Sequence, residues 1–93
     1  MFKTNTYFEG TVMSIAIENE DGVATIGAMK AGEYEFGTST VEYMTVVSGA
    51  MDVMLLGETA WTTYKPFETF IVPKDVRFKV SMKSETAYIC HYK

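Results

Sequence analysis

Residues 41–55 read V-E-Y-M-T-V-V-S-G-A-M-D-V-M-L, two apolar runs joined by a glycine turn, with an acid near the head of the first run. Polar and apolar side chains largely alternate along the stretch, which is the pattern of β-strands. Gly49 lies between the runs and supplies the positive φ angle that a hairpin requires. The stretch predicts a β-hairpin, and it raises the question of why Glu42 lies at the start of an apolar strand.

The same alternation extends over most of the chain, and no stretch of ten or more residues keeps the spacing of an amphipathic helix. Asp21-Gly22 marks a tight turn, and Pro73 is expected to end its strand because proline lacks an N–H donor. Further strands are expected at residues 11–17, 23–29, 33–36, 61–64, 69–72, 76–82 and 86–92. Many short strands at turn spacing predict an all-β sandwich or barrel.

Length and composition indicate one globular domain over residues 1–93, because 47% of the residues are hydrophobic and only 22% are charged. A chain this short buries a limited share of its surface, so we expect a homodimer. The formal net charge is −4, and the basic residues are scattered along the sequence. A nucleic-acid partner is therefore not expected, because binding one requires many clustered cations.

The first ten residues contain no apolar signal segment, and no uncharged run approaches the about 18 residues that span a bilayer. We therefore expect a cytoplasmic protein without a membrane partner. Cys90 is the only cysteine and His91 the only histidine, so neither a disulfide nor a metal site is expected. Alternation places these two residues on opposite faces, which favours a buried, unreactive Cys90. No cofactor motif is present.

A candidate binding surface lies in G-E-Y-E-F-G-T-S-T-V-E, residues 32–42, if the strand register holds past Gly37. Two aromatic rings, two hydroxyls and a carboxylate on one face would suit a nucleoside. The alternative is that the rings belong to the core, the threonines cap a turn and the acid is a surface group. The residues of this parity are Tyr34, Phe36, Thr38, Thr40 and Glu42.

Strict alternation in R-F-K-V-S-M-K, residues 77–83, puts Arg77 and Lys79 on one face and Phe78 on the other. Arg77 is the only arginine, and we expect it to face solvent. The functional alternative is an anion contact, if this sheet edge borders a pocket mouth or a dimer seam.

The frame of the first cupin motif is visible in Gly32, Glu42 and Gly49, and Pro73 fits the second. Thr38 and Thr40 occupy the places of metal-binding histidines in the first motif, and Phe78 takes that place in the second. The chain thus resembles the cupins without their metal ligands. The resemblance implies an all-β, single-domain cupin, a double-stranded β-helix or jelly-roll-like barrel.

More closely, the chain resembles the small cupins of the pyrimidine/purine nucleoside phosphorylase family over essentially its full length. The segments that carry the resemblance are N-x-Y-F-x-G at 5–10, G-E-Y-x-F at 32–36, E-x-M-T-V-x-S-G-A at 42–50, F-x-V-P at 70–73 and Y-I-C-H-Y at 88–92. In the last segment His91 occupies a position where an arginine is usual in that family. The resemblance implies a dimer that splits purine and pyrimidine nucleosides with inorganic phosphate, giving a free base and a (deoxy)ribose 1-phosphate.

Under this hypothesis each candidate residue has a role. Glu42 is the catalytic residue, which stabilises the positive charge that develops on the sugar. Arg77 and His91 are expected to bind phosphate, although histidine binds it more weakly than arginine would. The residues expected to bind substrate are Tyr34, Phe36, Thr38, Thr40 and Phe78, with the two threonines on the phosphate side.

Two other classes of function remain open. The lost metal ligands, together with the missing arginine at position 91, favour a non-catalytic cupin that binds a sugar or another metabolite. The third possibility is an interaction domain that uses its acidic surface to bind a partner. Phosphate-dependent release of base distinguishes the first hypothesis from both alternatives.

Overall fold

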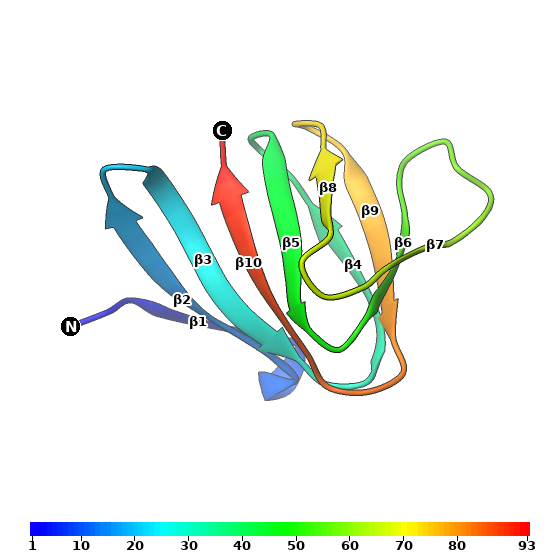
Figure 1. Ribbon diagram of the computed structural model, residues 1–93, viewed down its shortest axis with the longest axis horizontal. Helices are drawn as coiled ribbons and strands as arrows, with labels where there is room; N and C mark the ends of the chain where they lie inside the picture. The colour runs from blue at the N-terminus through cyan, green and yellow to red at the C-terminus, as the bar shows by residue number, and fades with distance from the viewer.

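A computed structural model describes residues 1–93 and contains ten strands and one short 3-10 helix (Figure 1). The first elements are β1 (Thr4–Tyr7), η1 (Phe8–Gly10), β2 (Val12–Asn19), β3 (Gly22–Met29) and β4 (Gly32–Gly37). The following strands are β5 (Glu42–Ser48), β6 (Met51–Met54), β7 (Thr62–Tyr64), β8 (Thr69–Val72), β9 (Arg77–Met82) and β10 (Thr86–Tyr92). No helix is long and apolar enough to cross a membrane.

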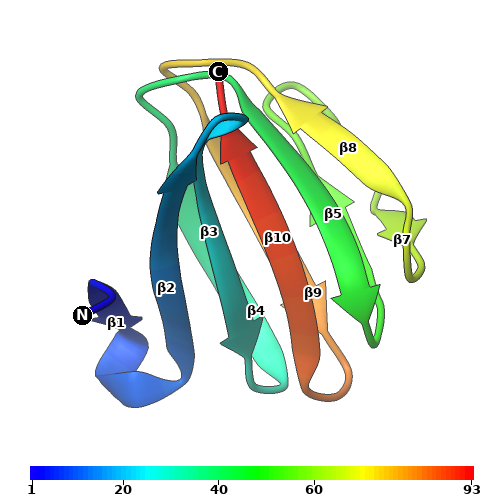
Figure 2. The ribbon, with the colours of Figure 1, turned by 60° about the vertical axis from the view of Figure 1, so that its left-hand side comes forward.

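The strands form two sheets that face each other. The six-stranded sheet has the order β1-β2-β3-β10-β5-β8, and the four-stranded sheet has the order β4-β9-β6-β7. Figure 2 shows β10 at the centre of the larger sheet, with β3 on one side and β5 on the other. The all-β prediction is confirmed, and the two sheets remain separate instead of closing into one hydrogen-bonded barrel.

The turn and parity predictions hold where the strands are regular. Gly22 and Gly49 have φ angles of 103° and 87°, values that favour glycine. The strand β8 ends at Val72, immediately before Pro73, as predicted. Along β9, Phe78 and Val80 are buried and Arg77 is exposed. The core consists of such inward side chains from both sheets, packed into one cluster of 14 residues.

The register between residues 34 and 42 differs from the expected continuous face. The strand β4 ends at Gly37 and β5 begins at Glu42, so the intervening segment bends away. Thr38 fixes this bend, because its Oγ1 donates a hydrogen bond to the Pro73 carbonyl at 2.7 Å and accepts one from the Val76 N–H at 3.1 Å. The end of β4 at Gly37 and the hydrogen bonds of Thr38 interrupt the predicted alternation. The strand β1 was also absent from the predicted set.

Candidate active site

A cavity of about 560 Å³ lies between the two sheets, where β4 faces β2, β5 and β10. It is lined by Tyr7, Phe8, Ser14, Met29, Glu35, Phe36, Gly37, Glu42, Met44, Phe78, Tyr88 and Tyr92. None of these residues is a lysine, arginine or histidine. No group of three or more His, Cys, Asp or Glu side chains is placed to hold a metal ion.

One wall of the cavity, the aromatic wall, comes from the four-stranded sheet and η1, and Glu35 of β4 lies beside its rings in the lining. The ring centroids of Phe8 and Phe36 are 5.6 Å apart, and those of Phe36 and Phe78 are 6.0 Å apart. Phe8 and Glu9 have φ angles of 51° and 58°, which a side chain other than glycine adopts only at a cost in free energy. This strained backbone sets the Phe8 ring beside the cavity, where planar rings can stack.

The opposite wall, the polar wall, belongs to the six-stranded sheet and carries polar groups beside the apolar side chains of Met29 and Met44. Glu42 at the start of β5 lies directly across from Tyr92 on β10, and both side chains line the cavity. The Tyr92 hydroxyl and Thr25 Oγ1 are 2.8 Å apart and share a hydrogen bond. This wall therefore combines one carboxyl group with hydroxyls.

Glu42 is the only acid that the larger sheet contributes to the cavity, and it is half-buried. Burial raises the pKa of the Glu42 carboxyl above its usual 4.5, and a hydrogen bond from Cys90 partly opposes the rise. The Cys90 thiol donates to Glu42 Oε1 at 3.5 Å. Burial, followed by the nearby Glu42 charge, raises the pKa of Cys90 strongly, so this thiol is a poor nucleophile.

The glycine at position 27 makes room for a second cavity tyrosine. Gly27 lies directly across from Tyr88 in the sheet. A Cβ atom at position 27 would approach the Tyr88 hydroxyl to 2.5 Å and the Met13 carbonyl to 2.7 Å. Tyr88 can therefore lie across β3 only because this residue has no side chain.

The structure brings three of the predicted site residues, Glu42, Phe36 and Phe78, together around the cavity. Tyr34 is buried beside them, with its ring centroid 6.4 Å from that of Phe36, and its hydroxyl donates to the Lys30 carbonyl at 2.9 Å. Tyr34 thus supports the aromatic wall from behind. It belongs to the core and does not line the cavity.

Thr38, Thr40 and Arg77 lie outside the cavity lining. Arg77 is on the outer face of β9, in a separate groove of about 790 Å³, where its Nε donates to Glu35 Oε2 at 3.0 Å. The groove and the cavity share Glu35, Gly37 and Phe78 in their linings. Arg77 therefore lies near the junction of the two spaces and not inside the cavity.

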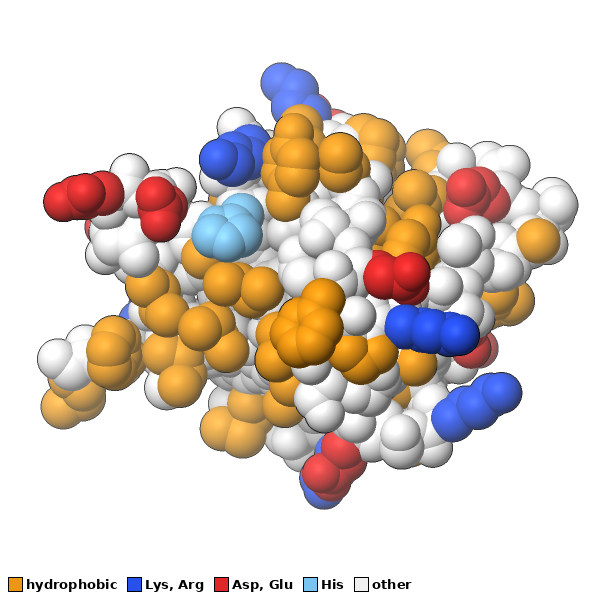
Figure 3. All heavy atoms as spheres, in the orientation of Figure 1, with side chains coloured by type: hydrophobic (Ala, Val, Ile, Leu, Met, Phe, Trp, Pro, Cys, Tyr) orange, Lys and Arg blue, Asp and Glu red, His pale blue; other side chains and the backbone are white.

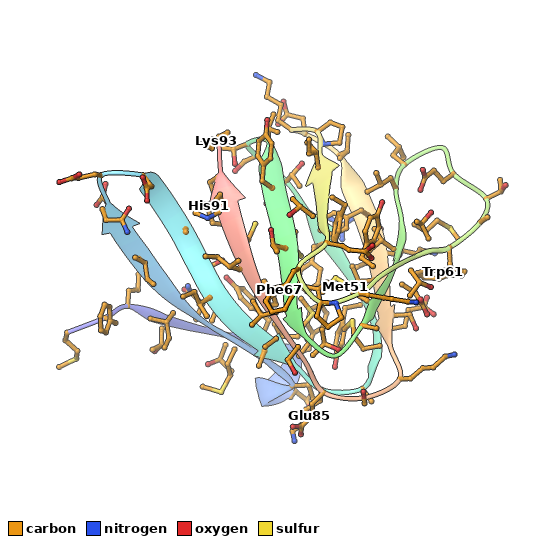
Figure 4. The ribbon with its side chains drawn as sticks, in the orientation of Figure 1. Met51, Trp61, Phe67, Glu85, His91 and Lys93 are labelled. Carbon is orange, nitrogen blue, oxygen red and sulfur yellow. The ribbon has the colours of Figure 1, made fainter.

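His91 is turned away from the cavity and lies apart from the other predicted site residues. Alternation along β10 directs Cys90 and Tyr92 inward, and it places His91 on the outer face of the sheet with Tyr43 and Lys93. Figure 4 shows His91 and Lys93 near the end of β10, and Figure 3 shows the imidazole exposed on that face. Within one chain, no geometry joins His91 to Glu42 around a common ligand.

The residue that sequence reasoning missed on the aromatic wall is Phe8, and those missed on the polar wall are Ser14, Tyr88 and Tyr92. Two signals were present in the sequence. Residues 7 and 8 fall within N-x-Y-F-x-G, a segment already noted for its resemblance, and Gly27 interrupts a strand, which marks a close approach of another group. Which group approaches depends on strand pairing.

The family described as pyrimidine/purine nucleoside phosphorylase matches residues 2–92. The chain belongs to the pyrimidine/purine nucleoside phosphorylase family. A pyrimidine/purine nucleoside phosphorylase of Pseudomonas putida strain F1 is 50% identical over 93 residues, covering 100% of this chain and 99% of that protein. A protein of the same name from Pseudomonas syringae pv. syringae strain B728a is also 50% identical and covers 100% of both chains.

Solved structures share the fold of this chain. A protein of unknown function from Vibrio parahaemolyticus has a TM-score of 0.96 and 42% identity, covering 100% of this chain and 99% of that chain. An RmlC-like cupin from Shewanella frigidimarina has a TM-score of 0.75 at 16% identity, covering 96% and 80%. The second likeness confirms the predicted cupin fold. This member of the phosphorylase family therefore has a cupin fold with an aromatic and acidic cavity.

Proposed function

We propose that this chain is a broad-specificity nucleoside phosphorylase whose reaction takes place in the cavity between the sheets. Inorganic phosphate attacks the anomeric carbon, the C–O bond to phosphate forms, and the glycosidic C–N bond breaks with its electron pair leaving on the base. The products are a free base and a (deoxy)ribose 1-phosphate. The observation that carries the proposal is the division of the cavity into an aromatic wall and a wall of carboxyl and hydroxyl groups.

The aromatic wall is suited to bind the base. Phe8, Phe36 and Phe78 offer ring faces and edges without any polar atom that would select one pattern of base substituents. Stacking energies are similar for all bases, because every base has a π-face. A site that holds the base in this way accepts both purines and pyrimidines.

Glu42 is suited to act on the sugar. Positive charge develops on the ring as the glycosidic bond breaks, and a carboxylate in a partly buried site stabilises that charge more strongly than one in water. Cys90 supports this role by donating a hydrogen bond to one carboxylate oxygen, which leaves the other free for the substrate. Holding both reactants in place contributes further to the rate.

Phosphate must be held near the mouth, because the cavity lining contains no cation. Arg77 is the candidate, since its Nη1 would lie 3.4 Å from a Cβ at Gly37, a residue that lines both the groove and the cavity. Its present partner Glu35 is exposed, and exposed ion pairs contribute little to stability. Exchange of this carboxylate for phosphate would therefore cost little. Thr38 lines the same groove as Arg77, and Thr40 lies two residues further along the segment between β4 and β5.

We also propose a homodimer that forms through the outer face of the six-stranded sheet. Figure 3 shows hydrophobic side chains over much of this face, and Met13, Ile15, Ile26 and Ile71 are exposed on its strands. Six strands about 5 Å apart and about six residues long present roughly 500 Å² of flat area. Projecting side chains add accessible area to this flat estimate. The sum approaches the buried area of a stable interface, which is about 800 Å² per partner.

The deciding experiment is incubation of the purified protein with several purine and pyrimidine nucleosides, with and without phosphate, and separation of free bases by chromatography. Base release that depends on phosphate is the expected result. Release without phosphate would indicate a hydrolase. No release in either condition, together with a ligand-induced rise in Tm, would favour the non-catalytic binding module. Light scattering of wild type and of Ile26→Asp tests the dimer, which the charge should disrupt.

A further inference from the structure

Two hydroxyl side chains of the polar wall have no role in the mechanism above. Ser14 comes from β2 and Tyr88 from β10, and both line the cavity. The two strands are separated by β3, where Gly27 is paired with Ser14 on one side and with Tyr88 on the other. The three residues therefore form one row across the sheet, with no side chain in the middle.

The empty middle position lets the two hydroxyls approach each other. The Tyr88 phenol lies over Gly27, so close that a Cβ there would be 2.5 Å from its oxygen. This direction carries the hydroxyl across β3 toward Ser14. Burial raises the pKa of Tyr88 to about 12, and the neighbouring Ser14 hydroxyl partly opposes that rise. Tyr88 consequently remains protonated and able to donate at neutral pH.

Both hydroxyls retain unused hydrogen-bonding capacity. Ser14 and Tyr88 are only 5% and 6% exposed, and neither makes a hydrogen bond of ordinary length and angle to a protein group. No fully buried side-chain nitrogen or oxygen in the protein lacks a partner, so these two oxygens reach the open space of the cavity. Tyr92 differs, because its hydroxyl is held by Thr25 at 2.8 Å.

We propose that Ser14 and Tyr88 form a subsite that binds one secondary hydroxyl of the pentose and thereby discriminates against the deoxynucleoside that lacks it. A sugar hydroxyl both donates and accepts, as do the two side chains. A substrate without that hydroxyl leaves two hydroxyls unpaired in a cavity with largely apolar walls, which is costly. The proposal rests on the proposed phosphorolysis and assigns the sugar to the polar wall.

The test compares kcat/KM for uridine, 2′-deoxyuridine and 3′-deoxyuridine in wild type, Tyr88→Phe and Ser14→Ala. Wild type should disfavour one of the two deoxy substrates by about tenfold. Both variants should bring that ratio close to one, because they lower the uridine value and leave the deoxy value nearly unchanged. Tyr64→Phe is the matched control, since it removes the same atom from a tyrosine of the other sheet that does not line the cavity, and it should keep the wild-type ratio.

The proposal is overturned if wild type does not discriminate, or if the variants lower all three values equally. A thermal melt of each variant establishes folding, and Ser14→Ala decides the matter by itself if Tyr88→Phe does not fold. Absence of phosphate-dependent cleavage of every nucleoside by wild type would instead refute the proposed function. By contrast, an active enzyme whose ratio of kcat/KM for uridine to kcat/KM for the deoxy substrate did not change in the Ser14 and Tyr88 variants would refute only the subsite.

Discussion

The thiol of Cys90 donates a hydrogen bond to Glu42 Oε1 at 3.5 Å, between two strands that are paired in the six-stranded sheet. This bond lowers the pKa of Glu42, whereas burial raises it. Cys90→Ala removes the donor and should move the acid limb of the kcat/KM profile to higher pH, while Cys90→Ser keeps a donor and should move it less. Superimposable profiles for wild type and Cys90→Ala would contradict the coupling.

Glu42→Gln should lower kcat by about 10²- to 10³-fold, because it removes the charge that is proposed to stabilise the sugar cation. The same substitution should raise the free energy of unfolding at neutral pH. Folding raises the pKa of Glu42, so the carboxyl favours the native state most below the unfolded value of 4.5 and loses that contribution as pH rises through the folded value.

The Gln variant should accordingly be more stable than wild type at pH 7, and this advantage should disappear at about pH 4. Thermal melts across this range measure the difference. A variant that is folded and retains wild-type phosphorolysis would eliminate Glu42 as the catalytic residue.

Gly27→Ala should destabilise the protein by about 1–3 kcal/mol, because the new Cβ would meet both the Tyr88 hydroxyl and the Met13 carbonyl at less than 3.0 Å. Gly37→Ala is the control within another strand. Its Cβ would meet the end of the Arg77 side chain at 3.4 Å and the Val76 carbonyl at 4.0 Å, both ordinary contacts, so the free energy of unfolding should change little. Urea denaturation of both variants provides the comparison, and equal losses would argue against the contact with Tyr88.

Phe8→Ala should raise KM about tenfold for purine and pyrimidine nucleosides alike, because a stacking surface is lost. The side chain is 47% exposed, so we expect the free energy of unfolding to change only slightly. Phe78→Ala should instead cost about 3–5 kcal/mol, since this ring is buried in the core. A base-selective effect of Phe8→Ala would show that the wall reads base identity.

Arg77→Ala should raise the KM for phosphate and leave the KM for nucleoside nearly unchanged, because Arg77 lines the neighbouring groove and not the cavity. Arg77→Lys should recover part of the affinity through its charge. His91→Ala should have no effect on phosphate kinetics, because its imidazole lies on the outer face of the other sheet. A larger effect of His91→Ala than of Arg77→Ala would reverse this assignment and implicate a partner subunit.

Alternation in the sequence was sufficient to predict the all-β class and the two faces of β9 and β10. It correctly separated Cys90 from His91, and Phe78 from Arg77. It could not show that the two phosphate candidates lie on different sheets, because parity within one strand says nothing about which sheet the strand joins.

The candidate site was only partly predictable for a related reason. Glu42 points inward because it pairs with Tyr92, not because it continues the face of Tyr34 across Gly37. The row of Ser14 and Tyr88 depends on the pairing of Gly27 with both residues, and Ser14 and Tyr88 themselves belong to strands far apart in the sequence. Such contacts are specified by the whole fold, so a local pattern does not predict them.

The central position of β10 has a consequence for biosynthesis. This strand joins β3 to β5 in the larger sheet, yet it follows both of them in the chain. A ribosome must therefore synthesise residues 86–92 before the two halves of that sheet can be connected. Until then the nascent chain exposes unpaired strand edges, which makes it a substrate for chaperones. The larger sheet can thus be completed only after β10 has been synthesised, although β2 and β3 can pair before then.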